Sequence, residues 1–184
     1  MTLYHRLIVG MPVVLSLGAC VLWSQTPGKK YIPLDKTDDI KNYKNWFCVT
    51  PRPVYLLPAI ATLCRPATPE EVKEDDSNPH MSRYFNVYVN PLGKKAMLTA
   101  KNPRFPVGSI IVKEKLPSEK SHSPELLTVM IKRKKGYDRA HGDWEYLVTN
   151  GKGTKIQECG KMETCQSCHA SQKTTDYVYR NYDS

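Results

Sequence analysis

Strand-like segments follow one another through the second half of this chain, and this succession limits its fold more than any other feature. The segments are rich in β-branched and aromatic residues, as β-strands are. Short links between successive strands favour antiparallel pairing of those strands. Residues 91–100 and 161–179 have helical patterns. We therefore expect an α+β fold, mainly an antiparallel β-sheet with flanking helices and a C-terminal helix. The predicted strands span residues 84–89, 109–115, 126–132, 144–149 and 154–157.

The N-terminus carries the pattern of an export signal. A short positive start containing Arg6 precedes the almost wholly apolar residues 7–23, and this order is typical of a secretory leader at residues 1–23. Within it, Leu17-Gly18-Ala19-Cys20 matches a bacterial lipobox, whose cysteine becomes lipidated. An uncleaved membrane anchor and a plain cleaved signal are the alternatives. All three place the protein outside the cytoplasm, either in the bacterial periplasm or as a lipoprotein anchored to the membrane and facing the periplasm.

Composition suggests how the rest of the chain is divided. Residues 24–45 are polar and are predicted to form a tether that ends in a short helix around 36–43. Residues 46–184 then form the folded domain. Within that domain, the acidic and turn-rich residues 70–79 are expected to form an exposed loop.

The net charge of +9 favours acidic partners or anionic surfaces. A nucleic-acid-binding protein would concentrate this charge on one face. Here the lysines are scattered, and the one run at residues 132–135 is typical of a solvated strand end. We therefore expect no nucleic-acid partner.

The last predicted helix contains Cys165-Gln166-Ser167-Cys168-His169, the C-x-x-C-H pattern of covalent haem attachment. Thiols three residues apart lie on one helical turn, where each can add to a haem vinyl group, and the following histidine can ligate the iron. A zinc site would need more ligands than Cys159 could add. A thioredoxin-like pair would need a βαβ setting. The motif thus predicts one covalent haem c, with Cys165 and Cys168 as attachment points and His169 as the axial ligand.

The other cysteines leave an open question. If Cys20 is lipidated, Cys48, Cys64 and Cys159 remain. In an oxidising compartment three cysteines permit one disulfide and leave one thiol. The sequence does not choose among the three pairings.

Four pieces of the sequence occur in a specific order and spacing. They are Asn86-Val87-Tyr88-Val89-Asn90-Pro91, Phe105 to Glu114, Gly142-Asp143-Trp144 and Cys165 to His169. With them the chain resembles the cytochrome P-460 family from about Trp46 to Tyr182. The resemblance implies a mainly antiparallel β fold with flanking helices, often in a homodimer. It also implies a five-coordinate haem with an open distal side, so that residues 46–184 would be a haem domain.

The resemblance extends to two kinds of member. One kind oxidises hydroxylamine and handles nitric oxide, and has a lysine bonded to the haem edge, a position that corresponds to Lys113 here. The other kind, the β-type cytochromes c-prime, lacks the bond and binds nitric oxide or related gases. Strand alternation places Lys113 on one face with Ile111 and Lys115. A desolvated amine there would be nucleophilic, whereas the alternative is a surface lysine whose ammonium group stays in water.

The distal side departs from the enzymatic members, which carry a glutamate sixteen residues before the tryptophan of the Gly-x-Trp segment. Counting back from Trp144 reaches Thr128, and a threonine cannot serve as a carboxylate base near neutral pH. Met130 shares a strand face with Thr128 and is the best candidate for a sixth iron ligand, although a strand methionine more often belongs to the core. We expect Thr128 and Met130 to line the distal pocket.

These features support two main hypotheses. The first is a haem oxidoreductase that oxidises hydroxylamine, nitric oxide or both at an open iron and passes electrons to a soluble cytochrome. The alternative is a non-catalytic cytochrome that binds nitric oxide or carbon monoxide or transfers electrons, like the β-type cytochromes c-prime, and the missing carboxylate favours it. A third possibility is a lipid-anchored electron carrier with a six-coordinate haem, which would need a ligand such as Met130.

Overall fold

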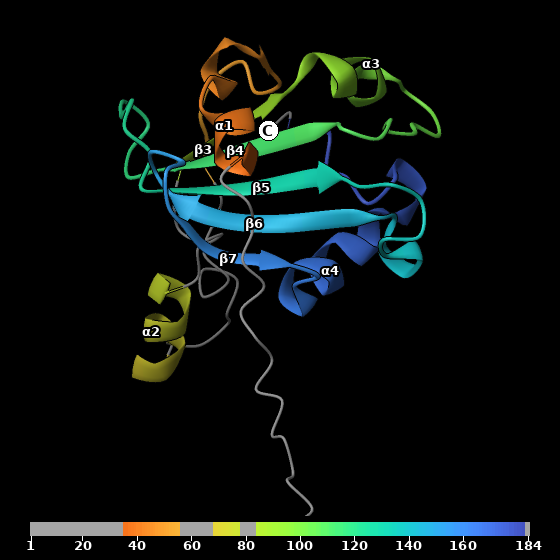
Figure 1. Ribbon diagram of the computed structural model, residues 1–184. Helices are drawn as coiled ribbons and strands as arrows, with labels where there is room; N and C mark the ends of the chain where they lie inside the picture. The colour runs from red at the N-terminus through yellow and green to blue at the C-terminus, as the bar shows by residue number, and fades with distance from the viewer. Residues whose placement is uncertain (1–34, 56–67, 78–83, 183–184) are drawn as a thin grey trace, which may run out of the picture. The chain divides into compact units, whose positions relative to one another are not determined.

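An antiparallel sheet organises the computed structural model, which describes residues 35–55, 68–77 and 84–182. The seven strands follow the order β1-β3-β4-β5-β6-β7, with β2 also paired to β3. Figure 1 shows β3 to β7 side by side in this order. Every pairing is antiparallel, and the expected α+β fold is confirmed. The strands are β1 (Phe47–Cys48), β2 (Val54–Tyr55), β3 (Tyr84–Val89), β4 (Ile110–Leu116), β5 (Leu126–Lys132), β6 (Trp144–Asn150) and β7 (Ile156–Gly160).

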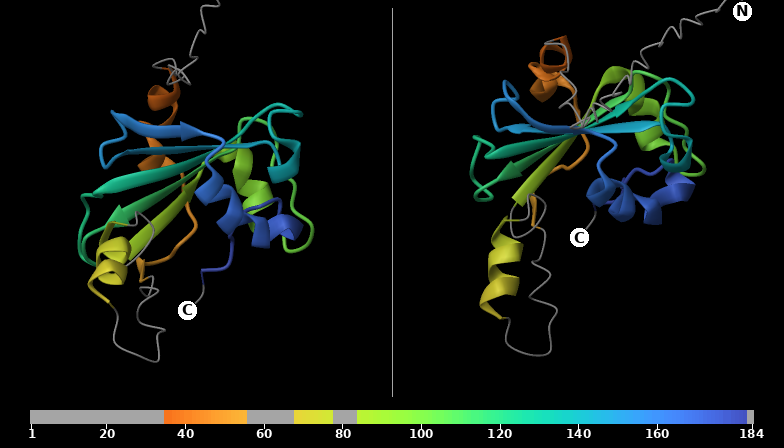
Figure 2. Two further views of the ribbon diagram at one scale, coloured as in Figure 1. Left: turned by 90° about the horizontal axis from the view of Figure 1, so that it is seen from below. Right: turned by 60° about the horizontal axis from the view of Figure 1, so that its bottom comes forward.

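Helices cover both faces of this sheet. On one face, α3 (Pro91–Leu98) and α4 (Glu163–His169) pack on side chains from β3 to β6, and η4 (Ala170–Thr175) continues from α4 (Figure 2). We call this the α4 face. On the other, the α1 face, α1 (Asp35–Ile40) and η1 (Tyr43–Asn45) cover a second apolar cluster. A further short turn, η3 (Arg139–His141), lies between β5 and β6. The central strands are therefore buried on both sides.

Residues 35–45 fall in the segment that the sequence assigned to a tether. The predicted short helix is present there as α1 and η1. Ile40 is 0% exposed and Tyr43 5% exposed, because both side chains pack into the cluster of the α1 face. In the structure these residues are part of the compact unit that begins at Pro33.

The acidic stretch at 70–79 was predicted to be an exposed loop, and that prediction is wrong, because residues Pro69–Ser77 form helix α2. A capping box begins this helix: the Thr68 backbone N–H donates to Glu71 Oε2 over 2.8 Å, and the Glu71 N–H donates to Thr68 Oγ1 over 3.3 Å. Pro69 stands in the first turn, and Glu70 and Glu71 complement the helix dipole there. The acidic residues therefore favour a helix start.

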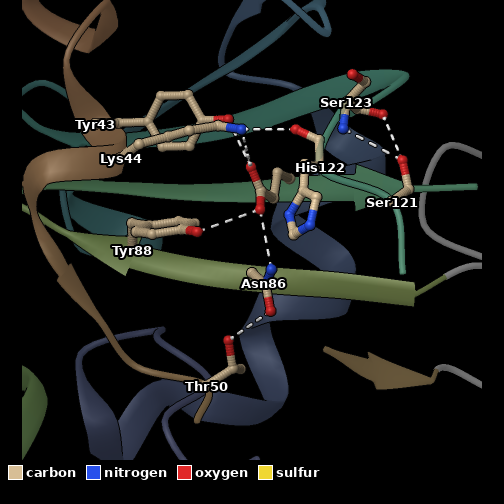
Figure 3. A network of polar contacts seen from close by, with 9 residues as sticks. Tyr43, Lys44, Thr50, Asn86, Tyr88, Ser121, His122 and Ser123 are labelled. Atoms are coloured by element: carbon tan, nitrogen blue, oxygen red, sulfur yellow. Dashed lines mark hydrogen bonds and ion pairs between the residues drawn. The ribbon is translucent and has the colours of Figure 1, made fainter. Parts of the chain in front are cut away.

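A buried carboxylate joins the N-terminal helices to the sheet on the α1 face. Glu114, 3% exposed, accepts hydrogen bonds from the Tyr43 hydroxyl at 2.6 Å, the Asn86 amide at 3.0 Å and the Tyr88 hydroxyl at 3.3 Å (Figure 3). Lys44 Nζ lies 3.8 Å from the same carboxylate. These contacts hold β4 at Glu114, so that the preceding residue, Lys113, is directed to the α4 face.

The strand order also removes one of the three cysteine pairings. Cys48 lies on β1 and Cys159 on β7, which are opposite ends of the strand order. Strands about 4.8 Å apart put these edges roughly 20 Å from each other, whereas disulfide-bonded Cα atoms lie within about 7 Å. A Cys48–Cys159 disulfide is excluded in this fold, and Cys64 lies outside the described residues.

The predicted leader at 1–23, with Cys20, also lies outside the described residues. Among those that the structure describes, no helix is long and apolar enough to cross a membrane.

Candidate functional site

Helix α4 presents the two thiols of the C-x-x-C-H motif beside the sheet. Met162, 8% exposed, is the N-cap residue, and its side chain packs in the cluster of the α4 face. One turn later the Gln166 amide donates to Asp138 Oδ2 over 2.6 Å. Between these anchors Cys165 is half-buried against the same cluster, while Cys168 is exposed. The spacing of the thiols along one helical turn is the one that a two-point attachment needs.

His169 ends α4, and its ring is held in a defined tautomer. Nδ1 lies 2.7 Å from the backbone oxygen of Tyr177. A carbonyl oxygen only accepts, so Nδ1 carries the proton and Nε2 keeps a lone pair for a metal. The ring lies 5.5 Å from Tyr146 and 5.3 Å from Tyr179. Burial lowers the pKa of His169, which keeps the ring neutral as an iron ligand requires.

Lys113 lies on the α4 face, on the strand next to Phe85. Its Nζ lies 4.3 Å from the centre of the Phe85 ring. Burial lowers the pKa of Lys113 to about 8, although the Cys168 thiol acts in the opposite direction. The amine in turn contributes to the lowered pKa of His169. Lys113 therefore lies within electrostatic reach of both Cys168 and His169, and its lowered pKa makes the neutral amine more accessible than in an exposed lysine.

Thr128 and Met130 lie on the same face as Lys113. In the strand register, Thr128 is the partner of Lys113 on one side and of Val148 on the other. Met130 lies between Ile111 and Tyr146, is 7% exposed and belongs to the core cluster. The structure thus brings Thr128 next to Lys113 and packs Met130 among apolar side chains.

Three charged residues close in sequence to Thr128 or Trp144 have other positions in the structure. Asp143 accepts hydrogen bonds from the N–H groups of Gly136 and Asp138. Lys132 forms an ion pair with Asp176 at 2.7 Å. Glu125 is exposed at the start of β5. None of the three lies in strand register with Lys113, whose partner is Thr128.

Tyr146 lies at the candidate site, although a tyrosine at its place on a strand is equally typical of core packing. It is 3% exposed, and its hydroxyl finds no hydrogen-bond partner among the described residues. Burial raises its pKa, and the next causes include the Cys165 and Cys168 thiols, so the hydroxyl lies near the motif. Tyr88, another strand tyrosine, lies on the opposite face near Glu114. Only the strand register distinguishes the two tyrosines.

The donor set fits a haem better than a zinc ion. Cys159 packs at the α1 face whereas Cys165 packs at the α4 face, so Cys159 does not join the thiol pair. Within the described ranges, no three His, Cys, Asp or Glu side chains gather as ligands of a metal ion. By contrast, three kinds of group lie together on the α4 face. They are the two thiols of α4, the His169 imidazole with a lone pair on Nε2, and the buried Tyr146 hydroxyl, which has no hydrogen-bond partner among the described residues. This arrangement suits a large aromatic macrocycle with one axial ligand.

An open hollow of about 230 Å³ borders this arrangement at Tyr179. Polar side chains line it, and it shares no residue with the motif. Because its walls are not those around Lys113, we do not assign the substrate to it. Its lining consists of Gln172, Thr175, Tyr179, Arg180 and Asn181.

The chain matches a known protein family. The family model described as cytochrome P-460 matches residues 67–180. A comparison with curated proteins found no match. The matched range includes the strands β3 to β7 and the whole C-x-x-C-H motif.

Proposed function

Because this chain belongs to the cytochrome P-460 family, and is thereby a haem cytochrome, we propose that it oxidises hydroxylamine, nitric oxide or both at an open haem iron. A soluble cytochrome would receive the electrons. The observation that carries the proposal is the convergence of Lys113 with Cys168 and His169 on the α4 face. When bound, the haem supplies an iron that holds the nitrogen of the substrate and takes up its electrons.

Cys165 and Cys168 would hold the haem covalently. Each thiol S–H adds across one vinyl double bond: the sulfur bonds to one carbon, and the hydrogen goes to the other. The addition needs no oxidant. Cys165 is half-buried beside Tyr146, and Cys168 is exposed on the same helical turn, which supports an attachment along the edge of the macrocycle.

His169 would ligate the iron through Nε2, since Nδ1–H donates to the Tyr177 carbonyl. With His169 as the protein ligand from α4, a haem held there would keep a coordination position available for substrate. Met130 would have to leave the core cluster to become a second ligand, which argues against a six-coordinate electron carrier.

Lys113 would bond to the haem edge. Its half-buried position and lowered pKa favour the neutral amine that a nucleophile needs. The new C–N bond replaces one N–H and one haem C–H, so that its formation releases two protons and two electrons to an oxidant of the peroxide class. Such a bond would distort the macrocycle and alter its redox chemistry.

A second candidate function is capture of nitric oxide or carbon monoxide without turnover, as in the β-type cytochromes c-prime. One observation favours it specifically: the register partner of Lys113 is Thr128. A hydroxyl can donate or accept a hydrogen bond there but cannot accept a substrate proton near neutral pH. Met130, Tyr146 and Val148 make the surrounding face largely apolar.

Export and assembly belong to the same proposal. The leader at 1–23 would send the protein to the periplasm, and lipidation of Cys20 would anchor it to the membrane. The resemblance suggests a homodimer. A cytochrome that receives electrons in the periplasm would meet the folded domain there.

Spectra and intact masses test the proposal. The full chain is produced in a bacterium that matures c-type cytochromes, and the polypeptide is denatured before mass measurement. We expect one haem to remain attached, and to be lost from the double variant Cys165→Ala/Cys168→Ala. We expect a far-red-shifted Soret band in the wild type and not in Lys113→Ala, with Lys115→Ala, on the same strand face, as the matched control. An ordinary c-type spectrum in all three would exclude the lysine bond.

Turnover then separates the two functions. Hydroxylamine-dependent reduction of an added acceptor is expected for the oxidase. Rapid binding of nitric oxide without such reduction would favour capture. Failure of the reduced protein to bind nitric oxide would contradict an open iron and support the electron carrier.

A further inference from the structure

The orientation of the His169 ring depends on a backbone carbonyl eight residues further along the chain. Its Nδ1 donates to the Tyr177 oxygen over 2.7 Å. Tyr177 and the preceding Asp176 both have positive φ, 65° and 58°. The left-handed region is unfavourable for a non-glycine residue. Two such residues in succession therefore need strong local contacts to stay in this conformation.

Asp176 receives those contacts from three distant parts of the chain. Its carboxylate accepts hydrogen bonds from the Phe105 backbone N–H at 2.9 Å and from Lys132 Nζ at 2.7 Å. Its own carbonyl accepts from Trp144 Nε1 at 2.7 Å. Asp176 is 5% exposed and Trp144 0% exposed. The loop before β4, the end of β5 and the start of β6 thus all bind this one residue.

Tyr177 is fixed from a different direction. Its hydroxyl donates to the Ala140 oxygen over 2.7 Å, and its backbone N–H donates to the Gln172 oxygen over 2.7 Å. Its ring lies directly on Gly142, where an added Cβ would come within 2.5 Å of the ring. Gly142 also has a φ of 71°. A side chain at Gly142 would therefore displace Tyr177, and with it the carbonyl that holds His169.

These contacts give the Gly-x-Trp segment, residues 142–144, a structural role. Gly142 lets the Tyr177 ring approach, and Trp144 binds the carbonyl of Asp176. Phe105, from another of the four family-like pieces, supplies both a backbone donor to Asp176 and a ring 5.5 Å from that of Trp144. Three distant parts of the sequence thus meet at the residue that precedes the acceptor of His169.

The geometry points to Asp176 as a positioning residue for the iron ligand: it holds the Tyr177 carbonyl against His169 Nδ1 and so sets the orientation and donor strength of the imidazole. This inference rests on the proposed function, in which His169 ligates the haem iron. A strong acceptor at Nδ1–H makes Nε2 a better donor to iron, which stabilises the ferric state and lowers the reduction potential. Weakening the acceptor should have the opposite effect.

Two holoprotein variants test the inference. Asp176→Asn removes the charge paired with Lys132 but keeps an oxygen for Phe105. Trp144→Phe removes the donor to the Asp176 carbonyl but keeps an aromatic ring beside Phe105. We expect both variants to shift the iron–histidine stretching frequency of the reduced protein downward and the reduction potential upward. The matched control is Tyr43→Phe, which removes a donor to the buried Glu114 on the opposite face.

The control separates positioning from general stability. Shifts in both variants, with wild-type values in Tyr43→Phe, would support the inference. Unchanged values in all three proteins would overturn it, and so would equal shifts in all three, because those would follow lost stability. If Asp176→Asn yields no holoprotein, Trp144→Phe alone decides by the same criteria.

The wild type distinguishes this test from that of the proposed function. If denatured wild-type protein carries no haem, or if His169→Ala keeps the wild-type iron spectrum, the proposed function fails and the inference fails with it. If the wild type passes both checks and the two variants show unchanged frequencies and potentials, only the role of Asp176 is refuted.

Discussion

At the scale of single residues, the two sheet faces hold tyrosines in contrasting environments. The Tyr43 hydroxyl donates to the buried Glu114 carboxylate at 2.6 Å. The Tyr146 hydroxyl is equally buried and has no partner among the described residues. Burial favours a hydroxyl only when it is hydrogen-bonded. Replacing tyrosine by phenylalanine should therefore affect the free energy of unfolding differently at the two positions.

We predict that Tyr43→Phe lowers the free energy of unfolding by about 1–3 kcal/mol, because the Glu114 carboxylate loses a charge-assisted hydrogen bond. Tyr146→Phe should leave the free energy of unfolding unchanged or raise it, because no hydrogen bond is lost. Denaturant unfolding of the holoproteins, followed by circular dichroism, gives both values. If Tyr146→Phe lowered the free energy of unfolding as much as Tyr43→Phe, the Tyr146 hydroxyl would have a hydrogen-bond partner in the haem-loaded protein.

At the scale of elements, local capping decides where two helices start. Asn90 caps α3: its Oδ1 accepts from Gly93 at 3.0 Å and from Ile110 at 3.1 Å, and its amide donates to Gly108. It thus joins the end of β3 to the start of β4. In α2 the capping box of Thr68 and Glu71 performs the same local task.

The Asn90 cap should be costly to remove. We predict that Asn90→Ala lowers the free energy of unfolding by about 2 kcal/mol or more, because a helix cap and a buried link between two strands are lost together. Thermal unfolding of the holoprotein checks this. Asn150 organises an exposed turn through Thr154 and Lys155 and offers a control. Asn150→Ala should lower the free energy of unfolding by less than Asn90→Ala does. An equal decrease would contradict the special role of Asn90.

The capping box of α2 predicts a local effect. In Thr68→Ala, amide hydrogen exchange across residues 69–77 should speed up several-fold, since an N-cap stabilises its helix by about 1 kcal/mol. Exchange in β4 and β5 should not change. Glu70→Ala removes a first-turn charge but leaves the box intact, so its effect should be smaller. Equal exchange in Thr68→Ala and the wild type would show that the cap does not hold the helix.

At the scale of the whole molecule, several buried or half-buried tyrosines are held in their neutral form. Burial raises the pKa of Tyr137 to about 12, and it raises the pKa values of the others above the ordinary value near 10. As pH rises past about 10, the unfolded chain loses these protons while the folded chain keeps them, so the free energy of unfolding falls. The tyrosines concerned are Tyr43, Tyr88, Tyr137, Tyr146 and Tyr182.

We therefore predict full tyrosine-linked stability below pH 10 and a progressive loss above it. Tyrosinate absorbance from the buried rings should appear together with the loss of circular dichroism, in one cooperative step. Ionisation of all tyrosines near pH 10 with the fold intact would contradict the burial that the structure shows.

Much of the sheet could be predicted from the sequence because strand patterns are local. The predicted strands at 84–89 and 126–132 have the observed bounds, the one at 144–149 ends one residue early, and the one at 109–115 begins and ends one residue early. The last strand was placed two or three residues too early, since the tight turn after Asn150 extends to Lys155. Helix α2 was missed because its acidic composition was weighed above the Thr68–Glu71 box.

By itself, the sequence determined the family, the α+β fold class and the motif at Cys165, Cys168 and His169, because each is a pattern of neighbouring residues. The tertiary structure alone decided which side chains share the α4 face: strand register brings Thr128 beside Lys113 and separates Tyr146 from Tyr88. It also brought Asp176, which belongs to no motif, to the centre of the contacts that orient His169. Such contacts join residues far apart in the chain, and no local pattern encodes them.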